Sequence, residues 1–271
     1  MINIENLPPA QGEKINTSSK GNQNKWFYQN RWYKQDGLGY EALSEVLVSR
    51  LLEKTNVGNY VPYRFEILEN QGRQFCGCVS ENFMKQEDER LISIERLVQA
   101  YYRESAAEMT AGIADIQERI KCIEDVVSKI TGLKDFGIYL KKIITIDALF
   151  FNEDRHFHNI AVVQRKDGSF RECPIFDNGA ALFSDIKHDY PLHLSVADCV
   201  RRIKAKPFAM DFDEQLDACD ILYGDFRFRA TFTMDDVERC VKEFEGIYNT
   251  EILERVRNTM RQQMRKYSYL F

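Results

Sequence analysis

The sequence lacks any long hydrophobic run. None of its apolar stretches approaches the length of about 18 residues that crosses a bilayer, so no membrane span is predicted. Residues 1 to 16 also lack the apolar core of a secretion signal. Basic charge is not in excess, because 37 basic and 42 acidic side chains leave a net charge of −5. Nucleic-acid binders are more often basic, so we expect no direct nucleic-acid binding.

Clustered cysteine is absent as well. The seven cysteines are scattered along the chain, and only Cys76 and Cys78 lie close together. Two residues apart on a strand is a poor spacing for metal chelation, and the odd total argues against a disulfide framework. We therefore predict buried, reduced thiols in a cytoplasmic protein. The sequence has no internal repeat and no low-complexity tract.

Length and composition are typical of a globular protein. Apolar residues make up 44% and charged residues 29% of the 271 positions. A chain of this size can form one large domain or two lobes around a cleft.

The most informative stretch spans residues 147–180. Asp154 and Asn159 lie five residues apart in D-R-H-F-H-N. An apolar run over 160–163 and a turn over 166–169 with an Asp-Gly step then predict a hairpin that leads to Asp177. A hairpin returns its ends to each other, so we expect Asn159 and Asp177 to lie close in space.

These residue types suit phosphoryl transfer. A kinase needs one carboxylate near the acceptor hydroxyl and oxygen ligands that hold Mg²⁺ on the nucleotide phosphates. We predict that Asp154 serves the hydroxyl and that Asn159 and Asp177 bind Mg²⁺, in the order and spacing of the protein-kinase signature. His156 is predicted to brace the loop by hydrogen bonds. A metal pair of His156 with His158 is the alternative, but no third ligand is near in sequence.

The first part of the chain adds a lysine and a glutamate. Two strands are predicted over 25–29 and 31–35, and a helix opens near Glu41. Lys34 ends the second strand, and Glu45 follows eleven residues later on the helix. A strand lysine braced by a helix glutamate is how kinases contact the nucleotide phosphates. Glu41 competes with Glu45 for the role of brace.

Together these motifs resemble the HipA-like bacterial Ser/Thr kinases, which carry a loop of the form S-x-x-G-x-Q-x-K, a strand lysine, a helix glutamate and D-x-H-x-x-N. The loop matches over 18–25. The resemblance implies an ATP- and Mg²⁺-dependent kinase with a protein substrate. It also implies the phosphate-loop residues Ser18, Ser19, Gly21 and Gln23. Autophosphorylation of the first of these, Ser18, is a further expectation.

The resemblance has one departure and two rivals. HipA-like kinases typically carry an extra N-terminal subdomain, for which a loop beginning at Ser18 leaves no room. A compact kinase with a small, separately encoded partner or antitoxin is therefore expected. Phosphoinositide kinases share D-R-H-x-x-N, so a lipid or small-molecule kinase is one alternative reading. A non-catalytic nucleotide-binding interaction module is the other.

The predicted fold class is α+β, a two-lobed protein-kinase-like fold with a small mixed sheet lobe and a larger helical lobe. The lobes are expected over 1–86 and 87–271. Further strands are predicted over 60–69 and 74–83. Further helices are predicted over 93–107, 113–130, 133–151, 233–246 and 251–266. The basic run from Arg201 to Lys206 is interpreted as a solvated helix face, and binding of an acidic or phosphorylated segment is the alternative.

Overall fold

The computed structural model describes residues 2–5, 7, 23–86 and 88–271. The chain forms two compact units, each built from separate stretches. Unit 1 comprises residues 1–83, 177–203 and 229–271, and unit 2 comprises residues 84–176 and 204–228. The chain therefore passes between the units four times. The lobe boundary that we expected at residue 86 stays a prediction.

Unit 1 contains a five-stranded sheet in the order β1-β4-β5-β3-β2. Its first strand pairs in parallel with the fourth, and the other pairs are antiparallel. The hairpin of the second and third strands confirms the predicted pair before and after Asn30. The strands are β1 (Ile2–Asn3), β2 (Lys25–Tyr28), β3 (Arg31–Gln35), β4 (Arg64–Asn70) and β5 (Arg73–Glu81).

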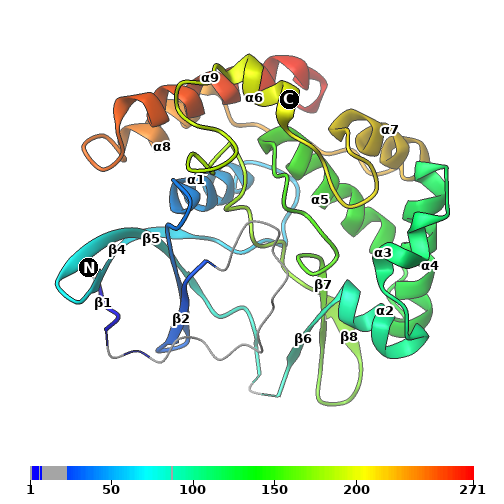
Figure 1. The fold of residues 1–271 in the computed structure, drawn as a ribbon. Coiled ribbons are helices and arrows are strands. Elements are labelled where there is room, and N and C mark those ends of the chain that lie inside the picture. Colours follow the sequence, from blue (N-terminus) through cyan, green and yellow to red (C-terminus); the bar gives the residue numbers. More distant parts are fainter. Residues whose placement is uncertain (1, 6, 8–22, 87) are drawn as a thin grey trace. The chain divides into compact units, whose positions relative to one another are not determined.

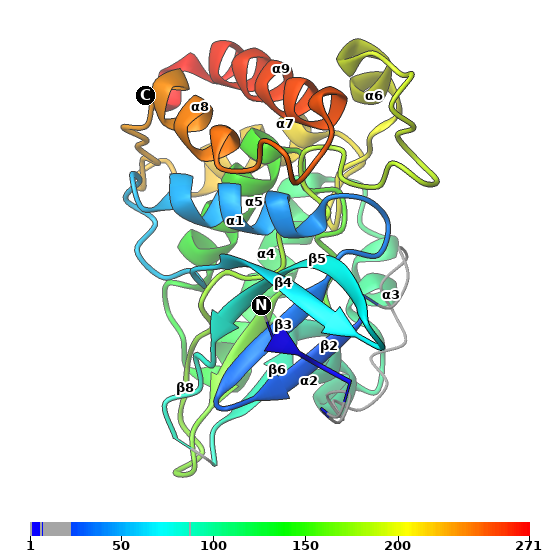
Figure 2. The ribbon, with the colours of Figure 1, turned by 90° about the vertical axis from the view of Figure 1, so that its left-hand side faces the viewer.

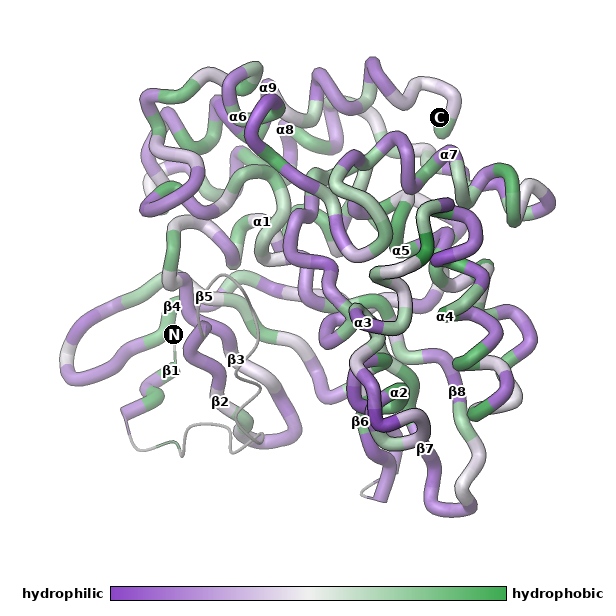
Figure 3. The backbone as a smooth tube through the Cα atoms, turned by 45° about the vertical axis from the view of Figure 1, so that its right-hand side comes forward, coloured by the Kyte–Doolittle hydropathy of each residue, from purple (hydrophilic) through white to green (hydrophobic). Residues whose placement is uncertain are grey.

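Helix α1 (Glu41–Leu52) forms the middle layer of unit 1. It packs against β4 and β5 on one side and α8 (Met234–Lys242) on the other, as Figure 2 shows. α9 (Thr250–Lys266) lies on α8 and also contacts α6 (Val196–Arg202). Because both sides of α1 are covered, eleven of its twelve residues are buried, its two glutamates included. α9 has one outer face, and Figure 3 shows hydrophilic and hydrophobic segments alternating along it.

Unit 2 is mainly helical (Figure 1). α5 is its most buried helix, and it packs against α4 and α7. A three-stranded antiparallel sheet in the order β6-β7-β8 packs against α2 through its first strand. The strands are β6 (Arg90–Ser93), β7 (Ala161–Gln164) and β8 (Phe170–Glu172). The helices are α2 (Ile94–Tyr102), α3 (Ala106–Ala111), α4 (Ile116–Thr131), α5 (Phe136–Phe150) and α7 (Phe212–Leu222).

One predicted helix is wrong in its extent. The segment 93–107 is two helices, because Arg103 ends α2 in the left-handed region with φ of 60°. Ser105 then starts α3 as the N-terminal cap of a capping box with Glu108. The other predicted helices and the hairpin of β7 with β8 are confirmed. The elements β1, β6 and α7 were not predicted. The basic run from Arg201 to Lys206 was expected to be helical, but α6 ends at Arg202 and residues 203–206 are irregular.

In the part of the chain that is described, no helix combines the length and the apolar character that a bilayer crossing requires. All seven cysteines are free thiols.

Candidate active site

Lys34 is a buried lysine held between two carboxylates of unit 1. Only 6% of the residue is exposed. Its Nζ lies 2.5 Å from Glu45 Oε1 on α1 and 2.7 Å from Asp177 Oδ1. A buried charge is costly unless it is paired and hydrogen-bonded, and Lys34 is both. Residues 11 and 143 positions away in the sequence thus converge on one ammonium group.

The electrostatics of this cluster keep the lysine charged. Burial by itself would lower the pKa of Lys34, but the carboxylates of Asp177 and Glu45 outweigh it. The pKa of Lys34 is therefore held well above its ordinary value. The ring of Tyr63 lies beside the ammonium, with 5.0 Å between Nζ and the ring centroid.

Glu45, and not Glu41, contacts the lysine. The carboxylate of Glu41 instead accepts the backbone N–H groups of three residues that precede α1, at 3.1, 2.5 and 2.9 Å; these are Gly37, Leu38 and Gly39. Glu41 therefore fixes the turn into the helix. Its place in the first turn of α1 also suits a negative charge, because the helix N-terminus is partially positive.

Asp177 is fixed through its backbone as well as its side chain. Its φ is 63°, in the left-handed region that Asn and Asp tolerate better than most residues. The next residue, Asn178, donates its N–H to Glu45 Oε2 at 2.9 Å. One glutamate thus holds both the lysine and the backbone that follows Asp177.

Lys25, which ends the predicted phosphate loop and opens the predicted strand over 25–29, belongs to the same cluster. It pairs directly with Lys34 across β2 and β3. Two like charges opposite each other are unfavourable unless an anion lies between them. Asp177 supplies that anion, since its Oδ2 lies 3.9 Å from Lys25 Nζ.

The predicted phosphate loop falls mostly outside the described residues. Ser18, Ser19 and Gly21 lie in the stretch 8–22, which the structure does not describe. Gln23 is described and is partly buried just before β2. Its role as a nucleotide ligand stays a prediction.

Unit 2 holds the other predicted residues in the loop after α5. That helix ends at Phe151, a left-handed cap with φ of 53°. Asn159 lies at the far end of the loop and donates its amide Nδ2 to the backbone oxygen of Asp154 at 3.0 Å. Because Nδ2 of Asn159 is used in this hydrogen bond, the other polar atom of the amide is Oδ1, which is the atom that could bind a cation.

Arg155 is the anchor of this loop. It is 1% exposed and donates to the carboxylate of Asp147, in the last turn of α5, from Nε and Nη2. Its Nη1 donates to the carbonyl oxygens of Asn159 at 3.1 Å and Phe176 at 2.7 Å. The two ends of the hairpin therefore meet on one guanidinium, and Asp177 is the next residue in the chain.

The carboxylate of Asp154 faces two nitrogen-bearing side chains of unit 2. Lys206 Nζ lies 3.4 Å from its Oδ1, and His156 Nε2 lies 3.8 Å from its Oδ2. The Asp154 side chain is 10% exposed. A carboxylate in this position can accept a hydroxyl proton. The contact of Lys206 with Asp154 differs from the sequence-based interpretation of Lys206 as part of a solvated helix face.

The donor set fits Mg²⁺ better than a transition metal. Asp177 offers a partly exposed carboxylate and Asn159 an amide oxygen, and Mg²⁺ is commonly held by one or two protein oxygens together with substrate phosphates. No described cluster of three or more His, Cys, Asp or Glu residues is suited to a metal ion. Asn159 belongs to unit 2 and Asp177 to unit 1, and their proximity stays a prediction.

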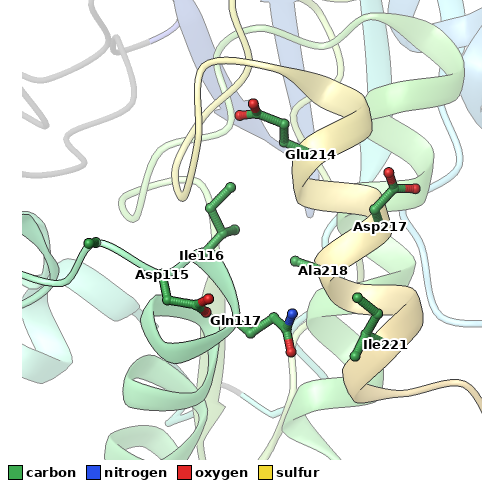
Figure 4. A pocket seen from close by; sticks show the side chains of 8 residues that line it. Asp115, Ile116, Gln117, Glu214, Asp217, Ala218 and Ile221 are labelled. Carbon is green, nitrogen blue, oxygen red and sulfur yellow. The ribbon is translucent and has the colours of Figure 1, made fainter.

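A separate cavity of about 400 Å³ lies between the start of α4 and α7 within unit 2 (Figure 4). It is lined by Ala114, Asp115, Ile116, Gln117, Glu214, Asp217, Ala218 and Ile221. None of the predicted site residues lines it. Asp115 caps α4 and Glu214 lies in the first turn of α7, so two of its acids have structural roles at helix N-termini.

Comparison with known proteins gives similarity in structure only. No known protein-family profile matches the chain, and no curated protein matches it in sequence. The proinflammatory kinase CtkA of Helicobacter pylori superposes with a TM-score of 0.61 at 13% identity, over 98% of this chain and 95% of that one. A second similar structure is HipA from Shewanella oneidensis MR-1, in the toxin–antitoxin complex with HipB and operator DNA. It superposes with a TM-score of 0.41 at 12% identity, over 97% of this chain and 68% of that one. A superposition as loose as the latter does not establish a shared fold.

The match to the Helicobacter pylori kinase covers nearly the whole of both chains. The protein therefore has a kinase-like fold with a five-stranded mixed sheet and a helical part, and the predicted fold class is confirmed. An identity of 13% establishes the fold alone.

Proposed function

We propose that this protein is a HipA-like kinase that transfers the γ-phosphoryl group of ATP to a Ser or Thr hydroxyl of a protein. The observation that carries the proposal is the buried Lys34 ammonium bound by Glu45 and Asp177. A core needs no buried cation with two carboxylates for its stability, since such groups are often replaced by apolar residues at little cost. In a kinase-like fold, a cation of this type contacts nucleotide phosphates.

The proposed roles follow the two halves of the site. Lys34 contacts the ATP phosphates and is oriented by Glu45. Asp154 orients the acceptor hydroxyl and accepts its proton. Asn159 and Asp177 hold Mg²⁺, which offsets phosphate charge when bound. His156 and the loop residues Ser18, Ser19, Gly21 and Gln23 complete the proposed site.

We further propose that the kinase itself is cytoplasmic and acts on a protein substrate together with a small, separately encoded partner or antitoxin. Ser18 is the proposed site of autophosphorylation. The phosphate loop is where an added charge of about −1.5 to −2 would repel ATP, so such a modification would limit the activity of the enzyme itself.

The test is incubation with γ-labelled ATP and Mg²⁺, followed by mass spectrometry of the enzyme and of a cell lysate. The wild type is expected to label Ser or Thr of a protein, whereas Asp154→Ala lowers the rate by about 10²- to 10⁴-fold. Asp167→Asn, at the exposed turn of the same hairpin, is the matched control and is expected to keep the wild-type rate. If only lipids or small molecules were labelled, the substrate would be one of these and not a protein. ATP binding without any transfer would indicate a non-catalytic interaction module.

A further inference from the structure

Lys206 approaches the proposed base from a loop that the kinase signature does not include. The loop connects residue 204, where the chain enters unit 2 for the second time, to α7. Lys206 Nζ lies 3.4 Å from Asp154 Oδ1, and the Lys206 side chain is 36% exposed. Both residues belong to unit 2, so this contact lies within one compact unit.

A buried glutamine on α7 fixes the course of this loop. Gln215 is 1% exposed, and its Oε1 accepts the N–H groups of Phe208 at 2.8 Å and Ala209 at 3.3 Å. Its Nε2 donates to the carbonyl oxygen of Lys206 at 3.3 Å. The backbone of Lys206 is thus held directly by the core of the unit.

Two more contacts tie the same loop to α4 and to the loop of Asp154. Arg119 on α4 donates from Nη1 to the carbonyl oxygen of Phe208 at 2.7 Å. The ring of Phe208 packs edge-on against that of Phe157, three residues after Asp154, with centroids 5.5 Å apart. Functional groups are placed most accurately when such supporting contacts fix them on rigid elements.

A plain surface ion pair does not account for this arrangement. Exposed lysine–carboxylate pairs contribute little to stability and need no scaffold of buried hydrogen bonds. Lys204, two residues earlier in the same loop, is an exposed lysine of the ordinary type. The difference between these two lysines is that one of them is directed at the proposed catalytic carboxylate.

We propose that Lys206 is a further catalytic residue, whose ammonium group binds the phosphoryl group as it reaches the acceptor oxygen. This inference rests on the proposed kinase function. An acceptor hydroxyl bound to Asp154 lies about 2.7 Å from the carboxylate. A cation 3.4 Å from the same carboxylate is close enough for its flexible stem to bring it to the phosphoryl group as that group reaches the acceptor oxygen.

The transfer exchanges one bond of the γ-phosphorus for another. The acceptor oxygen forms a bond to the γ-phosphorus while the bond from that phosphorus to the β,γ-bridging oxygen breaks. The electron pair of the broken bond leaves with ADP, and the hydroxyl proton moves to Asp154. Lys206 forms and breaks no covalent bond, because it acts only on the negative charge of the phosphoryl oxygens during transfer.

The experiment compares Lys206→Met, which keeps the stem and removes the charge, with Lys206→Arg and with the control Lys204→Met. ATP hydrolysis is measured first, since water is an acceptor that requires no identified substrate. The affinities for Mg-ATP and for Mg-ADP with aluminium fluoride, an analogue of the phosphoryl group in transit, are then measured by calorimetry. Thermal unfolding checks that each variant is folded.

Lys206→Met is expected to lower kcat by about 10²-fold and to weaken binding of the aluminium fluoride analogue by a similar factor. Its affinity for Mg-ATP is expected to stay within about twofold, because a group that acts only in transfer does not bind the ground state. Lys206→Arg should recover a large part of the wild-type kcat. The control Lys204→Met should have the full wild-type kcat.

Equal losses in affinity for Mg-ATP and for the analogue would overturn the assignment, as would a kcat within about twofold of the wild type. If Lys206→Met does not fold, Lys206→Arg decides, because a fully inactive but folded arginine variant also contradicts a purely electrostatic role. A wild type that neither hydrolyses ATP nor binds the analogue would reject the kinase proposal itself. A wild type that does both, with an unaffected Lys206→Met variant, would reject Lys206 alone.

Discussion

The guanidinium of Arg155 and the carboxylate of Asp147 form a buried ion pair, with Nε 3.0 Å from Oδ2 and both side chains 1% exposed. Asn152 donates to the same carboxylate from Nδ2 at 3.1 Å. Burial raises the pKa of Asp147, and the neighbouring Arg155 opposes that rise by favouring the charged form. The loop of Asp154 is thus fixed to α5 by one pair whose members depend on each other.

Removing one member of this pair is therefore expected to be costly. Arg155→Met leaves the Asp147 carboxylate buried without its cation, and we expect the free energy of unfolding to fall by about 3–5 kcal/mol. The double variant Asp147→Leu/Arg155→Met should regain part of that loss, because neither charge is then left alone. Urea unfolding measures the free energy of unfolding of both variants. Arg165→Met, at the exposed turn, is the control, and its free energy of unfolding is expected to lie within about 0.5 kcal/mol of the wild-type value. Similar values for Arg155→Met and the control would contradict the anchoring role.

The lysine cluster predicts different effects for the two glutamates of α1. Glu45→Gln removes the charge that faces Lys34, so we expect weaker positioning of the ATP phosphates and a reduced kcat. Glu41→Gln weakens the turn before the helix and leaves the contact of Glu45 with Lys34 in place, so we expect a small loss of stability and near-normal kinetics. Steady-state kinetics with ATP as the varied substrate distinguishes the two. A reduced kcat for Glu41→Gln together with a wild-type kcat for Glu45→Gln would show that the brace is assigned to the wrong residue.

Asp177→Asn tests the proposed Mg²⁺ ligand without disturbing the backbone. Asparagine tolerates the positive φ of this position as aspartate does, so the variant removes the charge, including the one that faces Lys34, and leaves the backbone in place. We expect Mg²⁺-dependent ATP binding to weaken at least tenfold by calorimetry. ATP binding measured in EDTA should change much less. The exposed Asp189→Asn serves as control, and equal ATP affinity for Asp177→Asn and wild type would place the metal elsewhere.

Asp36 predicts a pH dependence of stability. Burial, and to a lesser degree the carboxylate of Glu41, raises the pKa of Asp36 to about 8. Its carboxyl group accepts the hydroxyl of Tyr248 at 2.6 Å and the N–H of Ala42 at 2.7 Å. In the unfolded chain the pKa returns to about 4, so between these values the folded state holds one more proton.

The sign of the effect follows from that proton. The contribution of Asp36 to the free energy of unfolding should fall as the pH rises from about 4 to 8, by about 2 kcal/mol between pH 6 and pH 8, and then level off. Asp36→Asn mimics the protonated carboxyl group, so its stability should vary less with pH and exceed that of the wild type at pH 8. Urea unfolding at several pH values measures this. Parallel pH profiles for the two proteins would show that Asp36 does not titrate in this range.

Local signals in the sequence were sufficient for most helices and strands of the fold and for the contact between Lys34 and Glu45. The spacing of Lys34 and Glu45 predicts their contact because a strand end and the second turn of the next helix can face each other. Glu45 could not be chosen over Glu41 from sequence, since both lie on α1 and both are buried. The choice depends on the turn before the helix, where three N–H groups need an acceptor.

The anchors of the site depend on contacts that sequence patterns do not encode. Arg155 reads as a polar loop residue, yet it is the largest fully buried side chain of the chain's described part. Lys206 reads as one of several basic residues, and only the path of its loop over Gln215 directs it to Asp154. The break between α2 and α3 did have a signal, because Ser105 and Glu108 have the spacing of a capping box.

The assembly of unit 1 from three stretches has a consequence for biosynthesis. α8 packs against α1, and Lys54, just after that helix, forms an ion pair with Asp236 at 2.6 Å. During synthesis, all residues of unit 2 therefore leave the ribosome before residues 229–271, which cover α1, the helix that carries Glu45. The unit that carries Lys34 is completed last, so a prematurely terminated chain would contain the proposed base and an unfinished unit 1.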